Sequence, residues 1–220
     1  ARTAPFQSPA MNIADLRQEY TFAGLRRADL HPDPLQQFKN WFQAAIAAGV
    51  PEPNAVTLST VDGEGQPSSR IVLLKDIDPR GFTFYTNYNS RKGRELAQNP
   101  KAALTIFWPG LERQVCVRGA CEKLSREESE VYFKSRPIGN RLGAWASDQS
   151  SAVPDRDFLE KKFSEAASRF GENPPLPDYW GGYVLLPQTV DFWQGRPSRL
   201  HDRFLYTRIG EGWKVERLSP

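Results

Sequence analysis

The chain has 220 residues, with 29 Lys and Arg against 26 Asp and Glu, which leaves a formal net charge of +3. This length favours one large domain that buries its core without a disulfide or a structural metal. The small charge excess does not by itself indicate nucleic-acid binding. Cys116 and Cys121 form no CxxC pair and have no histidine pair nearby, so we expect no metal site and favour a reducing compartment.

No segment has the apolar core of a signal peptide, and none is long enough to span a membrane. We therefore expect a cytoplasmic protein whose partners include neither a membrane nor a nucleic acid. The polar residues 1–11, which contain two prolines, predict a disordered lead, and residues 12–220 predict a single domain.

Two helices are expected before the first strand. A short charged helix is predicted over 12–20. Asp33 can cap a second helix, with Pro34 at its first position and Gln36 completing a capping box, and Gly49 ends it. Its apolar stripe consists of Leu35, Phe38, Phe42, Ala45 and Ile46. Residues at this helical spacing predict a face that packs on the core.

Strands dominate the remainder of the pattern. Turn signals at 62–65, 78–81 and 109–110 separate strands in hairpin succession. The expected strands cover 55–61, 68–75, 82–86, 102–108, 113–123, 182–186, 190–194, 199–208 and 213–218. Helices are expected over 125–135, where Ser125 and Glu128 form a capping box, and over 155–170. The inward stripe of the last helix consists of Phe158, Leu159, Phe163, Ala166 and Phe170.

Hairpin succession with inserted helices predicts an antiparallel barrel with peripheral helices, which is an α+β fold. The sequence lacks sustained β-α-β alternation and has no GxGxxG after a strand. Both absences disfavour a Rossmann dinucleotide fold.

The segment at 89–93, Asn-Ser-Arg-Lys-Gly, follows a strand and opens a helix. Ser90 is a good N-cap, but Arg91 and Lys92 then fall in the first turn, where the helix dipole disfavours cations by about 0.3–1 kcal/mol each. A bound phosphate reverses this sign, because free backbone N–H groups and two cations converge on it. The alternative is a solvated helix start that tolerates the strain.

Other cations occur in pairs. Arg70 and Lys75 bracket an apolar strand, and their odd separation places them on opposite faces unless a bulge intervenes. Tyr132 and Arg136 lie four residues apart, so on a helix they share a face that could hold a phosphate or could simply be solvated.

Three cationic side chains alternate near the C-terminus. Arg199, His201 and Arg203 would share one face of a strand, which predicts the wall of a pocket for a flat anion or, equally, a basic edge strand. Acid–base groups are few, whereas groups that bind anions are several. That balance suits an enzyme whose organic cofactor performs the chemistry.

At these residues the chain resembles the pyridoxine (pyridoxamine) 5′-phosphate oxidases, from about residue 12 to residue 220. The matching segments are LRQEY at 16–20, GLRRADL at 24–30, RIVLLK at 70–75, FYTN at 84–87, SRK at 90–92, ERQV at 112–115, YFKSRP at 132–137, QSS at 149–151, WGG at 180–182, FWQG at 192–195 and RLHDR at 199–203.

The resemblance implies an FMN-binding split β-barrel that works as a homodimer, with FMN at the subunit interface. It implies oxidation of pyridoxine 5′-phosphate or pyridoxamine 5′-phosphate by O2 to pyridoxal 5′-phosphate, with release of hydrogen peroxide and, from the amine, ammonia.

The resemblance also implies roles for individual residues. The implied FMN contacts are Arg70, Ile71, Val72, Leu73, Leu74, Lys75, Tyr85, Thr86, Arg91, Lys92, Gln114, Gln149, Ser150, Trp193 and Arg203. The implied phosphate-binding residues for the substrate are Lys75, Tyr132 and Arg136. Arg199 and His201 would lie over the pyridine ring as catalytic residues, and Arg17 and Tyr20 belong to a segment that can cover the site.

Asn140 departs from the family pattern, which commonly has Ser four residues after the phosphate-binding Arg136. The amide can still donate to a substrate phosphate, but the loop at 137–141 is expected to pack differently. A flavin-binding protein without oxidase activity is the alternative function. Tyr132, Arg136, Arg199 and His201 argue against it, since a bare flavin binder does not need all four. An NAD(P)H-dependent flavin reductase is a third option, but nothing in the sequence resembles a dinucleotide-binding pattern.

Overall fold

The computed structural model describes residues 19–220. The expectations for the lead at 1–11, for Arg17 and for most of the helix at 12–20 lie outside the described residues. Glu19 and Tyr20, which end that expected helix, are not helical. Within the described part of the chain, no helix combines the length and the apolar character needed to cross a membrane.

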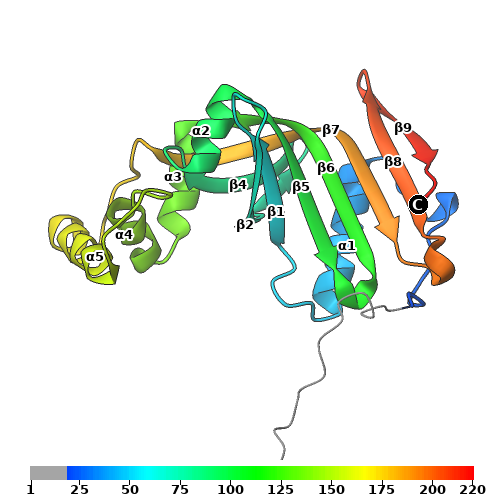
Figure 1. The fold of residues 1–220 in the computed structure, drawn as a ribbon, viewed down its shortest axis with the longest axis horizontal. Helices are drawn as coiled ribbons and strands as arrows, with labels where there is room; N and C mark the ends of the chain where they lie inside the picture. The colour runs from blue at the N-terminus through cyan, green and yellow to red at the C-terminus, as the bar shows by residue number, and fades with distance from the viewer. Residues whose placement is uncertain (1–18) are drawn as a thin grey trace, which may run out of the picture.

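Five α-helices and nine strands make up the regular structure of residues 19–220 (Figure 1). The helices are α1 (Pro34–Ala47), α2 (Arg91–Gln98), α3 (Arg126–Ser135), α4 (Ile138–Ala146) and α5 (Arg156–Phe170). The strands are β1 (Ala55–Val61), β2 (Pro67–Leu73), β3 (Asp76–Asp78), β4 (Gly81–Asn87), β5 (Lys101–Trp108), β6 (Arg113–Lys123), β7 (Trp180–Gln194), β8 (Asp202–Ile209) and β9 (Gly212–Arg217).

One curled sheet contains all nine strands, in the order β2-β1-β5-β6-β7-β4-β3, with β8 beside β7 and β9 beside β8. Every strand pair is antiparallel. Figure 1 shows α2 and α3 near one end of the sheet, α4 and α5 extending beyond that end, and β8 and β9 at the opposite end. The expected antiparallel α+β architecture is confirmed.

Helix α1 covers the core on the inner side of the sheet. Its Phe38 ring lies 5.0 Å from the ring of Phe82 on β4, and its Trp41 ring lies 5.2 Å from that of Phe192 on β7. The buried face of α1 runs through Phe38, Trp41 and Ala45, which leaves Ile46 at its margin with 48% of its surface exposed. The predicted inward stripe is therefore wrong at Ile46, and it omitted Trp41.

Asp33 caps α1 as expected, since its carboxylate accepts a hydrogen bond from the Leu35 N–H at 2.9 Å. The predicted capping box is wrong. The Asp33 N–H donates instead to Nδ1 of His31 at 3.0 Å, and the Gln36 side chain donates to Asn40. The His31 ring therefore accepts the hydrogen bond from the Asp33 N–H that the Gln36 side chain would accept in a capping box.

Strand β7 is continuous, so the two strands expected at 182–186 and 190–194 are one. Pro187 has no N–H for the ladder, but the partner strand β6 shifts register between Arg118 and Gly119, opposite the proline. A Cβ atom at Gly119 would lie 1.9 Å from the carbonyl oxygen of Leu186, so only glycine permits this approach.

Helix α4 forms where a loop was expected at 137–141. Gly139 and Gly143 weaken its helical signal in the sequence. Helix α5 packs on α4 at the end of the molecule rather than on the sheet (Figure 1). For that reason Phe158 and Phe163 stay 37% and 39% exposed, and the predicted inward stripe of this helix is wrong at both.

The strand expected at 199–208 begins only at Asp202. Pro197 starts a 3-10 turn that ends at Arg199, and Ser198 and Arg199 have φ angles of 55° and 59°. An extended strand excludes such angles. Arg199, His201 and Arg203 therefore do not alternate on one strand face, and that prediction is wrong.

Candidate functional site

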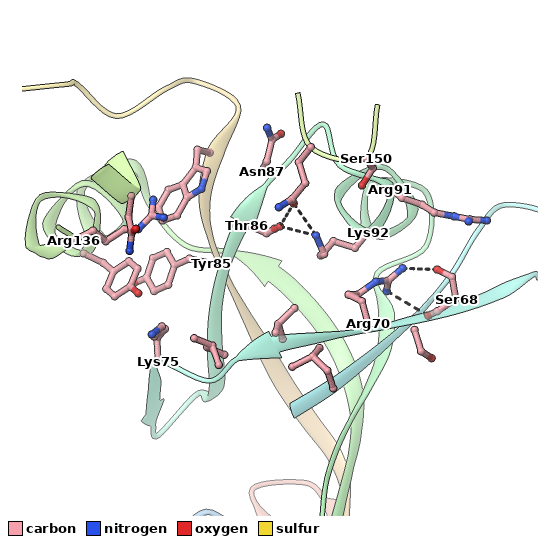
Figure 2. Close-up of a pocket in the computed structure, with 18 residues that line it drawn as sticks. Ser68, Arg70, Lys75, Tyr85, Thr86, Asn87, Arg91, Lys92, Arg136 and Ser150 are labelled. Atoms are coloured by element: carbon pink, nitrogen blue, oxygen red, sulfur yellow. Dashed lines mark hydrogen bonds between the residues drawn. The ribbon is translucent and has the colours of Figure 1, made fainter. Parts of the chain in front are cut away.

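A cleft of about 730 Å³ lies between β2, β4, the start of α2 and the junction of α3 with α4 (Figure 2). Its lining residues are Ser68, Ser69, Arg70, Ile71, Val72, Leu73, Lys75, Tyr85, Thr86, Asn87, Arg91, Lys92, Tyr132, Arg136, Asn140, Gln149, Ser150 and Trp180. Five of them are Lys or Arg, and no described residue of the lining is Asp or Glu. A wall with this charge favours an anionic ligand.

The start of α2 forms one end of the cleft, with Arg70, Arg91 and Lys92 gathered there (Figure 2). Ser90 caps the helix as predicted, since its hydroxyl accepts a hydrogen bond from the Gly93 N–H at 3.3 Å. Gly93 lets the helix start close to β4, because a Cβ atom there would lie 2.1 Å from the carbonyl oxygen of Tyr88. The two cations do occupy the first helical turn.

Lys92 is buried, with 8% of its surface exposed. Its ammonium donates to Gln149 Oε1 at 2.8 Å, Thr86 Oγ1 at 3.1 Å and Ser90 Oγ at 3.3 Å. All three acceptors are neutral. Burial, with a smaller contribution from the positive charge of Arg70, lowers the pKa of Lys92 to about 8. A buried cation without a contacting carboxylate leaves its charge available to an anion in the cleft.

The opposite end of the cleft carries Lys75, Tyr132 and Arg136. Strand β2 ends before Lys75, so the predicted placement of Arg70 and Lys75 on opposite strand faces does not apply, and both line the cleft. Tyr132 stacks on Tyr85 with ring centroids 3.8 Å apart. Tyr132 and Arg136 both line the cleft, although Arg136 follows the last residue of α3, so the alternative of a simply solvated helix end does not apply.

The guanidinium of Arg136 lies over the Trp180 ring, 4.5 Å from its centroid. Burial lowers the pKa of Arg136, and its buried Nη1 has no hydrogen-bond partner among the described residues. Buried donors are rarely left without an acceptor. This free donor at the cleft is suited to a ligand oxygen.

Most of the residues predicted around the cofactor meet at the cleft. Ile71, Val72 and Leu73 form an apolar wall, and Thr86 donates to Gln149 at 3.2 Å beside Ser150. The side chain of Leu74 is buried in the core instead, with 5% of its surface exposed. Asn140 lines the cleft from the first turn of α4.

The remaining predicted residues form a second cluster at the other end of β7. Gln114 pairs with Trp193, and Trp193 pairs with Arg203 across neighbouring strands. The Trp193 ring lies 4.5 Å from the ring of His201 and 5.6 Å from that of Tyr20. This second cluster does not line the cleft.

Arg203 and Arg199 differ in how the structure holds them. Asp191 accepts hydrogen bonds from Arg203 Nε at 3.0 Å and Nη2 at 2.6 Å, which fixes that guanidinium beside Trp193. Arg199 is exposed in the 3-10 turn.

Sequence reasoning gave no role to four residues of the lining: Ser68, Ser69, Asn87 and Trp180, although the last two lie in segments that match the family. The two serines are consecutive residues of an ordinary strand pattern and carry no signal. Trp180 could have been found as the aromatic residue before Gly181-Gly182, where a Cβ atom on Gly182 would lie 2.8 Å from the Tyr85 ring.

Comparisons with known proteins agree with one another. Residues 42–170 match the family model described as pyridoxamine 5′-phosphate oxidase, and residues 180–220 match the model described as pyridoxine 5′-phosphate oxidase C-terminal dimerisation region. The chain is 60% identical over 209 residues to the pyridoxine/pyridoxamine 5′-phosphate oxidase of Cupriavidus taiwanensis, covering 94% of this chain and 99% of that protein. It is 57% identical to the protein of the same name from Burkholderia thailandensis, with the same coverage.

Solved structures give the same fold. The chain superposes with a TM-score of 0.84 and 33% identity on PhzG from Burkholderia lata 383, solved in complex with tetrahydrophenazine-1-carboxylic acid, covering 88% of this chain and 95% of that one. An FMN-binding protein from Nostoc punctiforme related to pyridoxamine 5′-phosphate oxidase superposes with a TM-score of 0.69 at 19% identity, covering 87% of this chain and 100% of that one. The split-barrel fold is therefore confirmed.

Proposed function

The chain belongs to the pyridoxamine 5′-phosphate oxidase family, and we propose that its cleft holds FMN together with the phosphorylated substrate. The protein is a flavin-dependent oxidoreductase that converts pyridoxine 5′-phosphate or pyridoxamine 5′-phosphate to pyridoxal 5′-phosphate, with O2 as the acceptor. A flavin-binding protein without oxidase activity is not favoured.

The observation that carries this proposal is the division of the cleft into two cationic ends (Figure 2). Arg70, Arg91 and Lys92 suit the FMN phosphate, because a capped helix start adds free N–H groups to their charge. Lys75 and Arg136 suit the substrate phosphate, since Arg136 has a buried donor with no partner among residues 19–220. The apolar wall of β2 between the ends suits a flat ring.

The chemistry that bound FMN supplies is acceptance of a hydride and delivery of electrons to O2. The residues of this chain bind and orient. The Tyr85–Tyr132 stack and the Trp180 ring hold the hydroxyl of Tyr132 and the guanidinium of Arg136 in place, so the substrate phosphate is fixed at one end. Fixing the phosphate orients the 4′ carbon of the substrate for transfer.

A homodimer completes the proposed site. Trp180 and Trp193 lie at opposite ends of β7, and Gln114, Trp193 and Arg203 do not line the cleft of their own chain. We therefore assign these three residues to the cleft of the partner subunit. The match of residues 180–220 to a dimerisation region supports this assignment.

In the same assembly, Arg199 and His201 would reach the substrate ring from the second subunit, and Tyr20 would help to exclude water. His201 already accepts a hydrogen bond from the Arg196 N–H at Nδ1, 3.1 Å away, and this leaves Nε2 for the substrate. Tyr20 packs on both His201 and Trp193.

Two measurements on the purified protein test the proposal. Flavin released by heat should comigrate with FMN on chromatography, because the cleft offers one compact phosphate site at α2. Addition of pyridoxine 5′-phosphate in air should then yield pyridoxal 5′-phosphate and hydrogen peroxide. Recovery of FAD as the native flavin would refute the cofactor assignment, and bound FMN without product would favour the flavin store.

A further inference from the structure

Glu95 is a buried carboxylate that lies behind the cleft and does not line it. Its side chain, on the second turn of α2, is only 5% exposed. Oε1 accepts a hydrogen bond from Arg91 Nε at 3.1 Å, and Oε2 accepts one from Arg70 Nη2 at 3.2 Å. Each oxygen therefore holds a different arginine of the proposed phosphate site.

Two hydroxyl groups extend this network. Thr60 and Ser68 both donate to Glu95, and the oxygen atoms of both accept from the guanidinium of Arg70. A carboxylate only accepts hydrogen bonds, so the single proton of each hydroxyl must point toward Glu95. The hydroxyl lone pairs then face Arg70 and set the plane of its guanidinium.

Glu95 remains ionised at neutral pH. Burial opposes its ionisation, but the hydrogen bonds from Thr60, Ser68, Arg91 and Arg70 outweigh burial and lower the pKa of Glu95 to about 2. The network is therefore present across the range in which enzymes are assayed.

We propose that Glu95 is a positioning residue for the cofactor phosphate, which orients Arg70 and Arg91 without touching the phosphate. The inference rests on the FMN site proposed above. Net charge alone predicts the opposite effect, since removing a carboxylate near a phosphate should strengthen phosphate binding. Weaker FMN binding after removal of the Glu95 charge would therefore indicate that Glu95 orients the arginines, whereas tighter binding would indicate that only its charge matters.

Glu95→Gln is the informative substitution, because it keeps the shape and replaces one acceptor oxygen with an NH2 donor. Whichever way the amide turns, its NH2 group faces Arg91 or Arg70, and a donor then meets a donor. One guanidinium loses its anchor. A matched control is Glu160→Gln on α5, where Arg156 Nε lies 3.1 Å from Glu160 at the same i, i+4 spacing but in solvent.

The experiment measures the dissociation constants of FMN and of riboflavin, which lacks the phosphate, on the FMN-depleted full chain. For Glu95→Gln we expect the FMN constant to rise by about tenfold or more, which is about 1.4 kcal/mol, with the riboflavin constant unchanged. Glu160→Gln should match the parent protein for both flavins.

A second pair of variants covers the case in which Glu95→Gln alone does not fold. In an Arg91→Ala background, the amide can turn its oxygen to Arg70 and its NH2 into the vacated space. Adding Glu95→Gln to Arg91→Ala should then change FMN affinity little, a non-additivity expected of residues that act through one another. A further tenfold loss in that background would overturn the proposal.

Unchanged or tighter FMN binding by Glu95→Gln would overturn the inference, as would equal losses for FMN and riboflavin, which would show a general role in folding. If the parent protein itself bound FMN and riboflavin equally, the phosphate site would be wrong and the inference would fall with it. The parent measurement thus distinguishes the two failures.

Discussion

Replacing Lys92 with methionine should stabilise the FMN-depleted protein while weakening FMN binding. Lys92 is buried against neutral acceptors, and its pKa falls from the usual 10.5 to about 8. That difference corresponds to about 3 kcal/mol of folding free energy lost when the ammonium is buried. Methionine has a similar shape and no charge to desolvate.

The substitution also removes hydrogen bonds, but their acceptors keep other partners. Thr86 still donates to Gln149, and Ser90 still accepts from the Gly93 N–H. Each of the three lost bonds has a net value of about 0.5–1.5 kcal/mol, so their loss costs at least about 1.5 kcal/mol and the net gain is at most about 2 kcal/mol. For a chain of this size, a gain of this size raises Tm by at most roughly 4–8 °C.

The pH dependence follows from the lowered pKa. Below pH 8, both the folded and the unfolded chains carry the proton, so the penalty is present in full. Between about pH 8 and 10.5, only the unfolded chain holds the proton, so the stability of the parent protein rises with pH. The advantage of Lys92→Met should therefore be greatest at pH 7 and shrink as the pH approaches 10.

Thermal unfolding of FMN-depleted parent and variant, at one protein concentration and at several pH values, measures this difference. Lys161→Met, at an exposed position of α5, is the control and should show no pH-dependent gain. Added FMN should raise the Tm of the parent far more than that of Lys92→Met. A variant less stable than the parent at pH 7, or a gain that does not vary with pH, would refute the reasoning.

Three further outcomes are expected. Arg136→Leu should raise KM for pyridoxine 5′-phosphate by about tenfold or more, because it removes a hydrogen bond to a charged group. Flavin absorbance should show that FMN is retained. An unchanged KM would mean that Arg136 does not bind the substrate. Arg199→Lys and His201→Ala should lower kcat/KM with flavin content intact, whereas Arg203→Ala should lower flavin content. Full activity of Arg199→Lys and His201→Ala would contradict the proposed place of Arg199 and His201 over the substrate ring. FMN affinity of the parent should weaken as the pH rises above 8, because the phosphate favours protonated Lys92, and titration at pH 7 and 9.5 checks this.

Local signals predicted the parts of the structure that depend on short segments. The Ser125–Glu128 capping box and the helix start at Ser90 occur as expected, because both rest on hydrogen bonds within one turn. Cations in the first turn of α2 were locally unfavourable, and the same anomaly pointed to the proposed phosphate site. Such local conflict with helix chemistry is a usual mark of a functional site.

The failures depend on contacts distant in sequence. The alternation from Arg199 to Arg203 reads as a strand, but Pro197 and two residues with positive φ delay strand β8 until Asp202. The continuity of β7 through Pro187 depends on the register shift in β6, more than 60 residues earlier along the chain. Helix α4 forms despite Gly139 and Gly143 because α5 packs against it.

In the candidate site, too, features of short segments were predicted, and features that depend on distant contacts were not. Residue types and resemblance predicted most of the cleft lining, from Arg70 through Ser150. Glu95 gave no signal, since one acidic residue on a helix is usually solvated, and only its contacts with Arg70 and Arg91 reveal its burial. Sequence patterns also could not show that Trp193 does not line the cleft of its own chain, because its position depends on the course of β7.

Single-turnover oxidation under anaerobic conditions tests the central claim most directly. The purified protein, with its native flavin bound, would be mixed with pyridoxine 5′-phosphate in the absence of O2, and flavin absorbance and pyridoxal 5′-phosphate would be followed together. We expect the flavin absorbance to bleach as one pyridoxal 5′-phosphate forms per flavin, and to return when air is admitted. Flavin that stays oxidised in the presence of bound substrate would contradict the assignment of this cleft as an oxidase site.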